Sequence, residues 1–292
     1  MDPIPLPILL DGATGTQLFR RGMPHGTCPE AWILDHPEVL IALQQEYAAA
    51  GSQVLIAPTF GANRARLAQY GLGDRVEDYN RRLTALSRQA AAGRALVAGD
   101  LAPGGVSPAP FGEGSFAALV DLYAQQAAAL EAAGVDLFLI ETMVSMAEAR
   151  AAVLACKQVS ARPVWVTFTC DGNGRTPSGT DVLAALIVMQ GMGVSAFGLN
   201  CAEGPGVILE QLERLAPYTS VPLIAKPNAG LPQQSGDRAV YPCSPEEFAA
   251  HVPGLARAGG RIFGGCCGTT AAHIAALKAA VDGMDFSAFS PA

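Results

Sequence analysis

The sequence predicts an α/β protein with a single (β/α)8 (TIM) barrel, and three observations favour this fold. Short apolar runs alternate with helical patterns along the whole chain, the runs number eight, and no linker or internal repeat divides the 292 residues. Eight strand–helix units in a chain of this length are typical of one closed barrel. We therefore expect one domain over residues 1–292.

The eight apolar runs are the expected strands. Most are apolar along their whole length, as parallel strands are when both faces are covered. Their expected ranges are 8–11, 53–57, 95–100, 137–141, 164–169, 196–200, 223–226 and 261–264. The carboxyl ends of parallel barrel strands meet on one face, where we expect the functional residues. An open doubly wound sheet is the alternative, but the glycine-rich turn typical of it, G-x-G-x-x-G, does not occur.

Helical patterns fill the segments between the runs. Apolar side chains at i, i+3, i+4, i+7, i+11 and i+14 from Phe116 form one stripe, which predicts a helix. Ser244, followed by Pro245 and Glu247, has the pattern of a helix start. The uncharged stretch 182–202 is interrupted by polar residues and glycines, so we expect a short buried helix and a buried strand there rather than a membrane span.

Composition excludes several classes of protein. Half of the residues are hydrophobic and 15% are charged, which excludes a mainly disordered chain. A net charge of −7 argues against nucleic acid and anionic membrane as partners. No basic segment followed by an apolar run opens the sequence, so we expect a cytoplasmic protein. In that reducing setting, clustered cysteines are more often metal ligands or catalytic groups than disulfides.

The strongest chemical signal is the sequence GGCCGTT at residues 264–270, where the last expected strand ends. Consecutive strand side chains point to opposite faces, so Cys266 and Cys267 reach one point only if the backbone turns, and the flanking glycines permit such a turn. Cys201 ends the sixth strand, which one strand separates from the eighth. Three thiolates can then bind one zinc ion and leave its fourth position open, as in catalytic zinc sites. The alternative is that the three are buried packing residues. The other cysteines are expected to pack or to lie at the surface, with the role of the last left open: Cys28, Cys156, Cys243 and Cys170.

Two carboxylates follow expected strands on the same face. Asp11 ends the first strand in the sequence LDGATGTQL, and Glu141 ends the fourth in FLIET. If they face one cavity, they can hold an ammonium group through charge-assisted hydrogen bonds. The alternative is that each caps a helix or pairs with an arginine.

Five motifs resemble those of the homocysteine S-methyltransferase family and occur in the family's order. They are DGATGT at 11–16, PTFGAN at 58–63, GLNC at 198–201, KPNAG at 226–230 and GGCCGTT at 264–270. The resemblance runs from about residue 9 to about residue 281. It is strongest to the homocysteine-binding module of cobalamin-dependent methionine synthase.

The resemblance implies a (β/α)8 barrel in which the three cysteines of the zinc site are both metal ligands and catalytic residues. It also implies homocysteine as the substrate, with its amine met by Glu141 and Asp11, and it places Asn228 beside the metal. The expected substrate-binding residues are Asp11, Gly12, Thr59, Phe60, Glu141, Asn200 and Asn228.

The expected activity is zinc-dependent methyl transfer. Zinc deprotonates a thiol that is otherwise mostly protonated at neutral pH, and the zinc-bound homocysteine thiolate then attacks an activated methyl group to give methionine. No Asp-x-His-x-x-Gly cobalamin motif occurs in the sequence, so we expect the donor to be a free small molecule or a methyl-corrinoid on a separate protein or module. The resemblance, above all in the sequence GCCGTT at 265–270, favours the methyl-corrinoid. S-methylmethionine or betaine as donor is the alternative.

Two other functions compete with this one. Lys226, at the end of a barrel strand, is a candidate amine nucleophile for a Schiff-base lyase or aldolase. A non-catalytic zinc subunit of a methyl-transfer complex would bind zinc without adding homocysteine to its ligands. Lys226 is also a departure from the family, whose members often have an acidic or uncharged residue before Pro-Asn-Ala-Gly.

Overall fold

The computed structural model contains the expected barrel. Its strands are β1 (Ile8–Leu9), β2 (Val54–Ile56), β3 (Leu96–Leu101), β4 (Leu137–Met143), β5 (Val164–Phe168), β6 (Ala196–Cys201), β7 (Leu223–Pro227) and β10 (Gly260–Phe263). Within the described residues, 5–106, 112, 114–235 and 238–286, these eight parallel strands form one sheet in the order β1-β10-β7-β6-β5-β4-β3-β2. A parallel bridge between Leu10 and Val54 joins the β1 and β2 edges, so the sheet closes into a barrel. The two ends of the expected domain, residues 1–4 and 287–292, lie outside the described residues.

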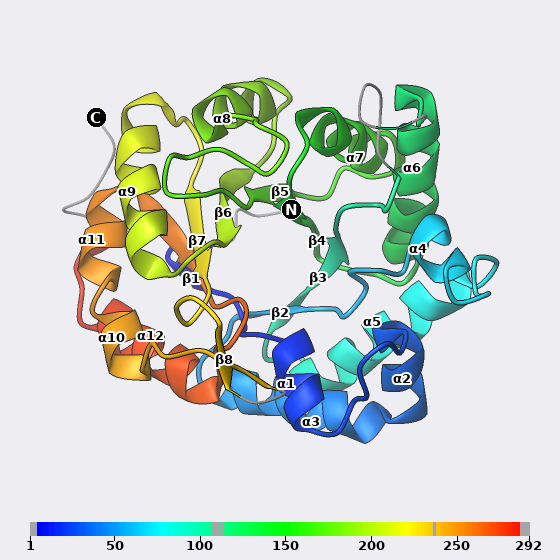
Figure 1. Ribbon diagram of the computed structural model, residues 1–292, viewed down its shortest axis with the longest axis horizontal. Helices are drawn as coiled ribbons and strands as arrows, with labels where there is room; N and C mark the ends of the chain where they lie inside the picture. Colours follow the sequence, from blue (N-terminus) through cyan, green and yellow to red (C-terminus); the bar gives the residue numbers. More distant parts are fainter. Residues whose placement is uncertain (1–4, 107–111, 113, 236–237, 287–292) are drawn as a thin grey trace.

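Helices surround the strands, which occupy the centre of the molecule in Figure 1. They are α1 (Gly15–Arg20), α2 (Pro29–Asp35), α3 (Pro37–Ala49), α4 (Arg64–Ala68), α5 (Val76–Ala91), α6 (Phe116–Ala132), α7 (Met146–Val159), α8 (Val182–Gly191), α9 (Pro205–Leu215), α10 (Pro245–Ala249), α11 (Val252–Arg257) and α12 (Ala271–Asp282), with a 3-10 turn at Ala216–Tyr218. The apolar stripe of α6 is buried at Leu119, Tyr123 and Leu130, which confirms that helix. Ser244 Oγ accepts a hydrogen bond from Glu247 N at 3.2 Å and completes a capping box, so α10 begins where expected.

The strand predictions agree with the structure to within two residues at each end. The stretch 182–202 contains α8 and β6, and no helix in the described part of the chain is long and apolar enough to cross a membrane. The structure adds an antiparallel hairpin that the sequence did not predict, β8 (Gln233–Ser235) and β9 (Arg238–Val240). Its strands are short and mostly polar, so no apolar alternation marks them.

The inside of the barrel positions the site. Side chains two residues apart along a strand share a face. The apolar inward positions form one buried cluster of Ile8, Leu10, Val54, Ile56, Ala98, Leu137, Leu139, Trp165, Ala196, Ile224 and Ile262. At the next such position on β3, β4 and β7, the side chain is ionisable, namely Asp100, Glu141 and Lys226. The apolar interior therefore ends in a buried layer of ionisable side chains at the carboxyl ends of the strands.

Candidate metal centre and active site

Three cysteines from distant parts of the chain meet at the carboxyl ends of β6 and β10. Cys201 is the last residue of β6, and Cys266 and Cys267 lie in the turn after β10, with β7 between the two strands. Their sulfurs all lie within 4.8 Å of one another, and those of Cys201 and Cys266 are 3.1 Å apart. Sulfurs about 2.3 Å from a tetrahedral zinc ion lie roughly 3.8 Å from each other. The sulfurs of Cys201 and Cys266 therefore need to move apart only slightly for the three side chains to hold such an ion.

The turn after β10 brings the cysteine pair out of the strand, as the sequence predicted, but its glycines act in two ways. Gly268 has a φ of +83°, a conformation that strains any residue with a Cβ. Gly265 is needed for space instead, because a Cβ there would lie 2.4 Å from Thr269 Oγ1. Backbone hydrogen bonds of 2.7 and 2.9 Å join both cysteines to the end of β7 and the residues after it, which fixes the turn.

The backbone beside the cysteine cluster is strained. Cys201, Ala202 and Thr142 have φ values of +58°, +56° and +59°, in the left-handed region that residues other than glycine rarely occupy. Asn228 holds the first two, since its backbone N–H donates to Cys201 O (3.1 Å) and its Nδ2 donates to Ala202 O (2.7 Å). Such conformations persist where surrounding contacts hold the backbone in place, and they concentrate at functional sites.

The two predicted asparagines support the cluster from different sides. Asn200 Oδ1 accepts hydrogen bonds from Thr142 N and Thr167 Oγ1, both at 3.0 Å. Its Nδ2 donates to Thr142 Oγ1 at 2.7 Å and lies 3.8 Å from Cys266 Sγ. Asn228 Oδ1 is buried and has no hydrogen-bond partner within the described residues. A buried oxygen that lacks a partner, next to three thiols, fits the position beside a metal that the resemblance gives Asn228.

The three sulfurs interact electrostatically. Hydrogen bonds from Cys201 and Cys266 lower the pKa of Cys267 to about 3, so this thiol is the most acidic of the three. Donation to Cys266, together with burial, raises the pKa of Cys201 above its ordinary value. The Tyr241 hydroxyl also hydrogen-bonds Cys267 and helps to lower its pKa. A divalent cation is the usual counter-charge for thiolates that converge in this way.

The cysteines face a cavity of about 280 Å³ at the mouth of the barrel. The lining includes Asp11, Gly12, Phe60, Asp100, Glu141, Lys226 and the three cysteines. Gly12 lies against the Tyr47 ring, and a Cβ on Gly12 would come within 2.7 Å of that ring. Phe60 is 38% exposed, so the wall runs from a partly exposed aromatic side chain to buried charges.

The buried ionisable groups in the cavity wall include Lys226, Glu141, Asp11 and Asp100. Lys226 Nζ donates to Glu141 Oε2 at 2.8 Å, and these side chains are 5% and 9% exposed. Burial opposes the charge on Lys226, but Glu141 and other anionic neighbours outweigh it and raise the pKa of Lys226 well above its ordinary value. Burial also raises the pKa of Asp11 to about 7 and that of Asp100 well above its usual range. A Schiff-base nucleophile needs a lysine with a lowered pKa, so this ion pair disfavours the aldolase alternative.

The structure divides the predicted substrate residues into two groups. Those that line the cavity are Asp11, Gly12, Phe60 and Glu141. Those that support its wall are Thr59, Asn200 and Asn228. The Thr59 hydroxyl, for example, is fully buried and donates to Asp100 O at 2.9 Å.

Sequence reasoning did not assign Asp100 or Tyr241 to the site. Asp100 ends an expected strand, and that position was an available signal. Tyr241 follows the unpredicted β9, so no sequence pattern pointed to it.

A closed parallel barrel with a thiol cluster and buried charges at its carboxyl face defines a barrel enzyme with a thiol-rich site. The family model described as homocysteine S-methyltransferase matches residues 8–281. The chain belongs to this family, which confirms the predicted family. It is 34% identical to a methionine synthase of Mycobacterium tuberculosis (strain ATCC 25618 / H37Rv) and 33% identical to one of Mycobacterium leprae (strain TN). Each match covers 93% of this chain and 24% of the relative, so the chain spans about a quarter of those methionine synthases.

Solved structures share the barrel. The metallated form of the homocysteine methyltransferase MmuM from Escherichia coli is 28% identical, with a TM-score of 0.78 over 93% of this chain and 95% of that chain. Its apo form has a TM-score of 0.73 at the same identity, over 94% and 95% of the two chains. A dihydrodipicolinate synthase from Agrobacterium tumefaciens str. C58 is 14% identical with a TM-score of 0.51 over 95% of this chain and 78% of that chain, which shows a common fold alone.

Proposed function

We propose that this chain is a zinc-dependent homocysteine S-methyltransferase that holds zinc through Cys201, Cys266 and Cys267 and forms methionine. The observation that carries the proposal is the meeting of these three sulfurs, within 4.8 Å of one another, in the wall of a cavity lined by carboxyl groups. Family membership supports homocysteine as the acceptor. The existence of a metallated form of the E. coli homocysteine methyltransferase, which shares the barrel, supports metal binding by this chain.

The residues of the chain bind and orient the acceptor in this proposal. Asp11 and Glu141 accept hydrogen bonds from the substrate amine, and Phe60 closes the apolar side of the cavity. Thr59 and Asn200 position the wall, because their side chains bond neighbouring strand ends. When bound, zinc supplies a deprotonated and oriented thiol at neutral pH. The new S–C bond forms in line with the bond that breaks, and the electron pair of the broken bond leaves with the methyl donor.

The proposed donor is a methyl-corrinoid carried by a separate protein or module. The methionine synthases that support it are matched over 24% of their length, so most of each relative lies outside the matched barrel. A small donor such as S-methylmethionine or betaine is the second candidate. It is favoured by the match to 95% of the E. coli homocysteine methyltransferase chain, since one barrel accounts for nearly all of that protein.

A donor panel tests the proposal. Zinc-loaded protein and homocysteine are incubated in turn with methylated corrinoid protein, methylcobalamin, S-methylmethionine, betaine and methyltetrahydrofolate, and methionine is measured by mass spectrometry. We expect methionine with a methyl-corrinoid and none from a Cys267→Ala variant. Methionine from S-methylmethionine or betaine alone would establish the second candidate. No methionine with any donor, from a protein that binds zinc but does not add homocysteine to the zinc ligands, would leave the non-catalytic zinc subunit as the better account.

A further inference from the structure

Lys226 is a buried ammonium with unused hydrogen-bonding capacity. It lines the cavity, its side chain is 5% exposed, and its Nζ donates to Glu141 Oε2 at 2.8 Å. An ammonium group carries three N–H donors. Within the described residues this is the one hydrogen bond that Lys226 Nζ makes, so its further donors are available to a ligand in the cavity.

Two carboxyl oxygens in the same cavity wall lack partners. Asp11 Oδ1 and Asp100 Oδ1 are buried and have no hydrogen-bond partner in the part of the chain that the structure describes. The other oxygen of Asp11 accepts from Ile56 N at 2.8 Å, which fixes the carboxyl group. Buried polar atoms without partners are uncommon in folded proteins. Both residues line the cavity, so a small adjustment of either side chain would present its oxygen to a ligand with hydrogen-bond donors.

We propose that Lys226 binds the α-carboxylate of the amino-acid substrate and that Asp100 joins Asp11 and Glu141 around its α-ammonium. The Lys226–Glu141 pair holds opposite charges side by side, and an amino acid holds opposite charges on adjacent groups of its α-carbon. The two pairs can therefore align head to tail through charge-assisted hydrogen bonds. The inference rests on the proposed function and specifies how that site selects its substrate.

Simpler ligands and a simpler role explain less of the cavity. A thiol with an ammonium but no carboxylate would leave the free donors of Lys226 unused. A thiol with a carboxylate but no ammonium would face three carboxyl groups. A purely structural Lys226 that neutralises Glu141 accounts for the ion pair but leaves the Asp11 and Asp100 oxygens without partners.

Homocysteine analogues that lack one charge separate these possibilities. The first, 3-aminopropane-1-thiol, lacks the carboxylate, and the second, 4-sulfanylbutanoate, lacks the ammonium. Isothermal titration calorimetry gives the affinity of the zinc-loaded protein for all three thiols. The variants are Lys226→Met, Asp100→Asn and the control Lys157→Met, whose lysine is exposed on α7.

We expect Lys226→Met to weaken homocysteine binding by about tenfold to a hundredfold, because the variant loses a charge-assisted hydrogen bond. The affinity for 3-aminopropane-1-thiol should stay unchanged. Asp100→Asn should weaken the binding of both amine-bearing thiols and leave the affinity for 4-sulfanylbutanoate unchanged. Lys157→Met should change none of the three affinities. Because Lys226→Met leaves Glu141 buried without its partner, the double variant Lys226→Met/Glu141→Gln is measured as well. It should show the same loss of preference for homocysteine over 3-aminopropane-1-thiol.

The outcomes distinguish this inference from the proposed function. If wild-type protein binds homocysteine at zinc but both Lys226 variants keep the preference for homocysteine over 3-aminopropane-1-thiol, the inference is wrong and the proposed function stands. An equal loss of affinity for homocysteine and for 3-aminopropane-1-thiol would likewise assign Lys226 a structural role and overturn the inference. If the zinc-loaded wild type binds none of the three thiols, the proposed function is wrong and the inference with it.

Discussion

Cys201, Cys266 and Cys267 act as a set, because each sulfur lies within 4.8 Å of the other two. Replacing Cys266 by Ala leaves two sulfurs, too few for a tight zinc site in this cluster. We expect the zinc content to fall from about one ion per chain to nearly none after dialysis, measured by plasma mass spectrometry. A Cys243→Ala variant is the control, since this partly buried cysteine lies outside the cluster. A Cys266→Ala protein that keeps a full equivalent of zinc would contradict the assignment.

Asp11 links the stability of the metal-free fold to pH. Burial raises the pKa of Asp11 to about 7 in the folded protein, whereas an unfolded aspartate titrates near 3.9. A raised pKa contributes stability that is present below the unfolded value and is lost as the pH rises through the folded value. The free energy of unfolding of the wild type should therefore fall by about 4 kcal/mol relative to Asp11→Asn between pH 4 and pH 8.

Urea unfolding of the reduced, metal-free proteins measures this pH dependence. Asp121→Asn is the matched control, because Asp121 is exposed on α6 and its replacement should leave the pH profile like that of the wild type. A constant difference between wild type and Asp11→Asn across this range would show that Asp11 keeps an ordinary pKa in the fold.

Among the elements, the turn after β10 sets the geometry of the cysteine pair. A Cβ on Gly268 would lie 2.1 Å from the Tyr241 ring, at a φ of +83°. Gly268→Ala should therefore lower the free energy of unfolding by more than about 1 kcal/mol and weaken zinc binding. Gly191→Ala in α8 is the control, because a Cβ there meets nothing within 4 Å and alanine favours a helix. Equal stability of the two variants, each with wild-type zinc affinity, would contradict the role given to this turn.

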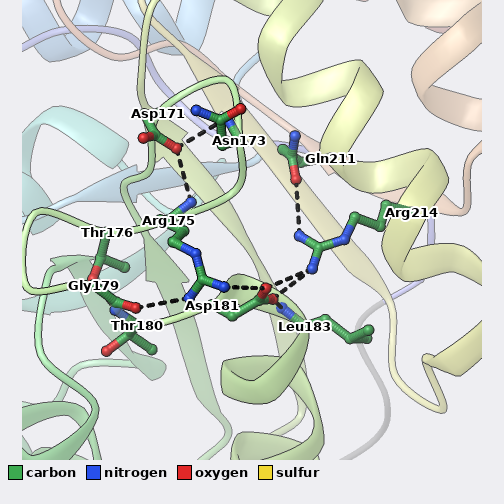
Figure 2. Close-up of polar contacts among 10 residues, drawn as sticks. All are labelled: Asp171, Asn173, Arg175, Thr176, Gly179, Thr180, Asp181, Leu183, Gln211 and Arg214. Atoms are coloured by element: carbon green, nitrogen blue, oxygen red, sulfur yellow. Dashed lines mark hydrogen bonds and ion pairs between the residues drawn. The ribbon is translucent and has the colours of Figure 1, made fainter.

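Polar side chains hold the loop between β5 and α8, as Figure 2 shows. Asp171 Oδ1 accepts from Arg175 N at 2.9 Å, which closes the start of the loop. Asp181 Oδ1 accepts from Leu183 N at 2.8 Å and so caps α8. Both oxygens of Asp181 also bind Arg214 of α9, at 2.8 and 2.6 Å. One carboxylate thus joins the loop, the helix that follows it and the next helix.

Removing that carboxylate should loosen the loop. Asp181→Ala removes a helix cap and a partly exposed ion pair, so we expect a loss of about 1–2 kcal/mol in the free energy of unfolding. Asp282→Ala is the comparison, because its i,i+4 pair with Lys278 is exposed and should contribute less than about 1 kcal/mol. Thermal unfolding of both variants measures the difference. An Asp181→Ala protein as stable as Asp282→Ala would show that the loop does not depend on this carboxylate.

For the whole molecule, the barrel was predictable because buried parallel strands are apolar throughout, and a local reading of the sequence detects that pattern. The cysteine cluster was predictable for a different reason. Barrel closure fixes which strand ends are neighbours, so Cys201 on β6 had to lie one strand away from the pair after β10. The structure brings these residues together as the sequence indicated.

The remainder of the site depends on contacts that no local pattern records. Lys226 and Glu141 form an ion pair although they lie 85 positions apart in the chain. Tyr241 reaches Cys267 after the β8–β9 hairpin, whose short polar strands carry no strand signal. The partnerless oxygen of Asp100 is likewise a property of the folded wall, because only burial removes it from water.

The zinc environment, measured by X-ray absorption at the zinc edge, tests the central claim most directly. For the zinc-loaded protein we predict three sulfur ligands at about 2.3 Å and one lighter ligand. Addition of homocysteine should replace the lighter ligand with a fourth sulfur. Fewer than three sulfurs without substrate, or a ligand set that homocysteine leaves unchanged, would contradict the account.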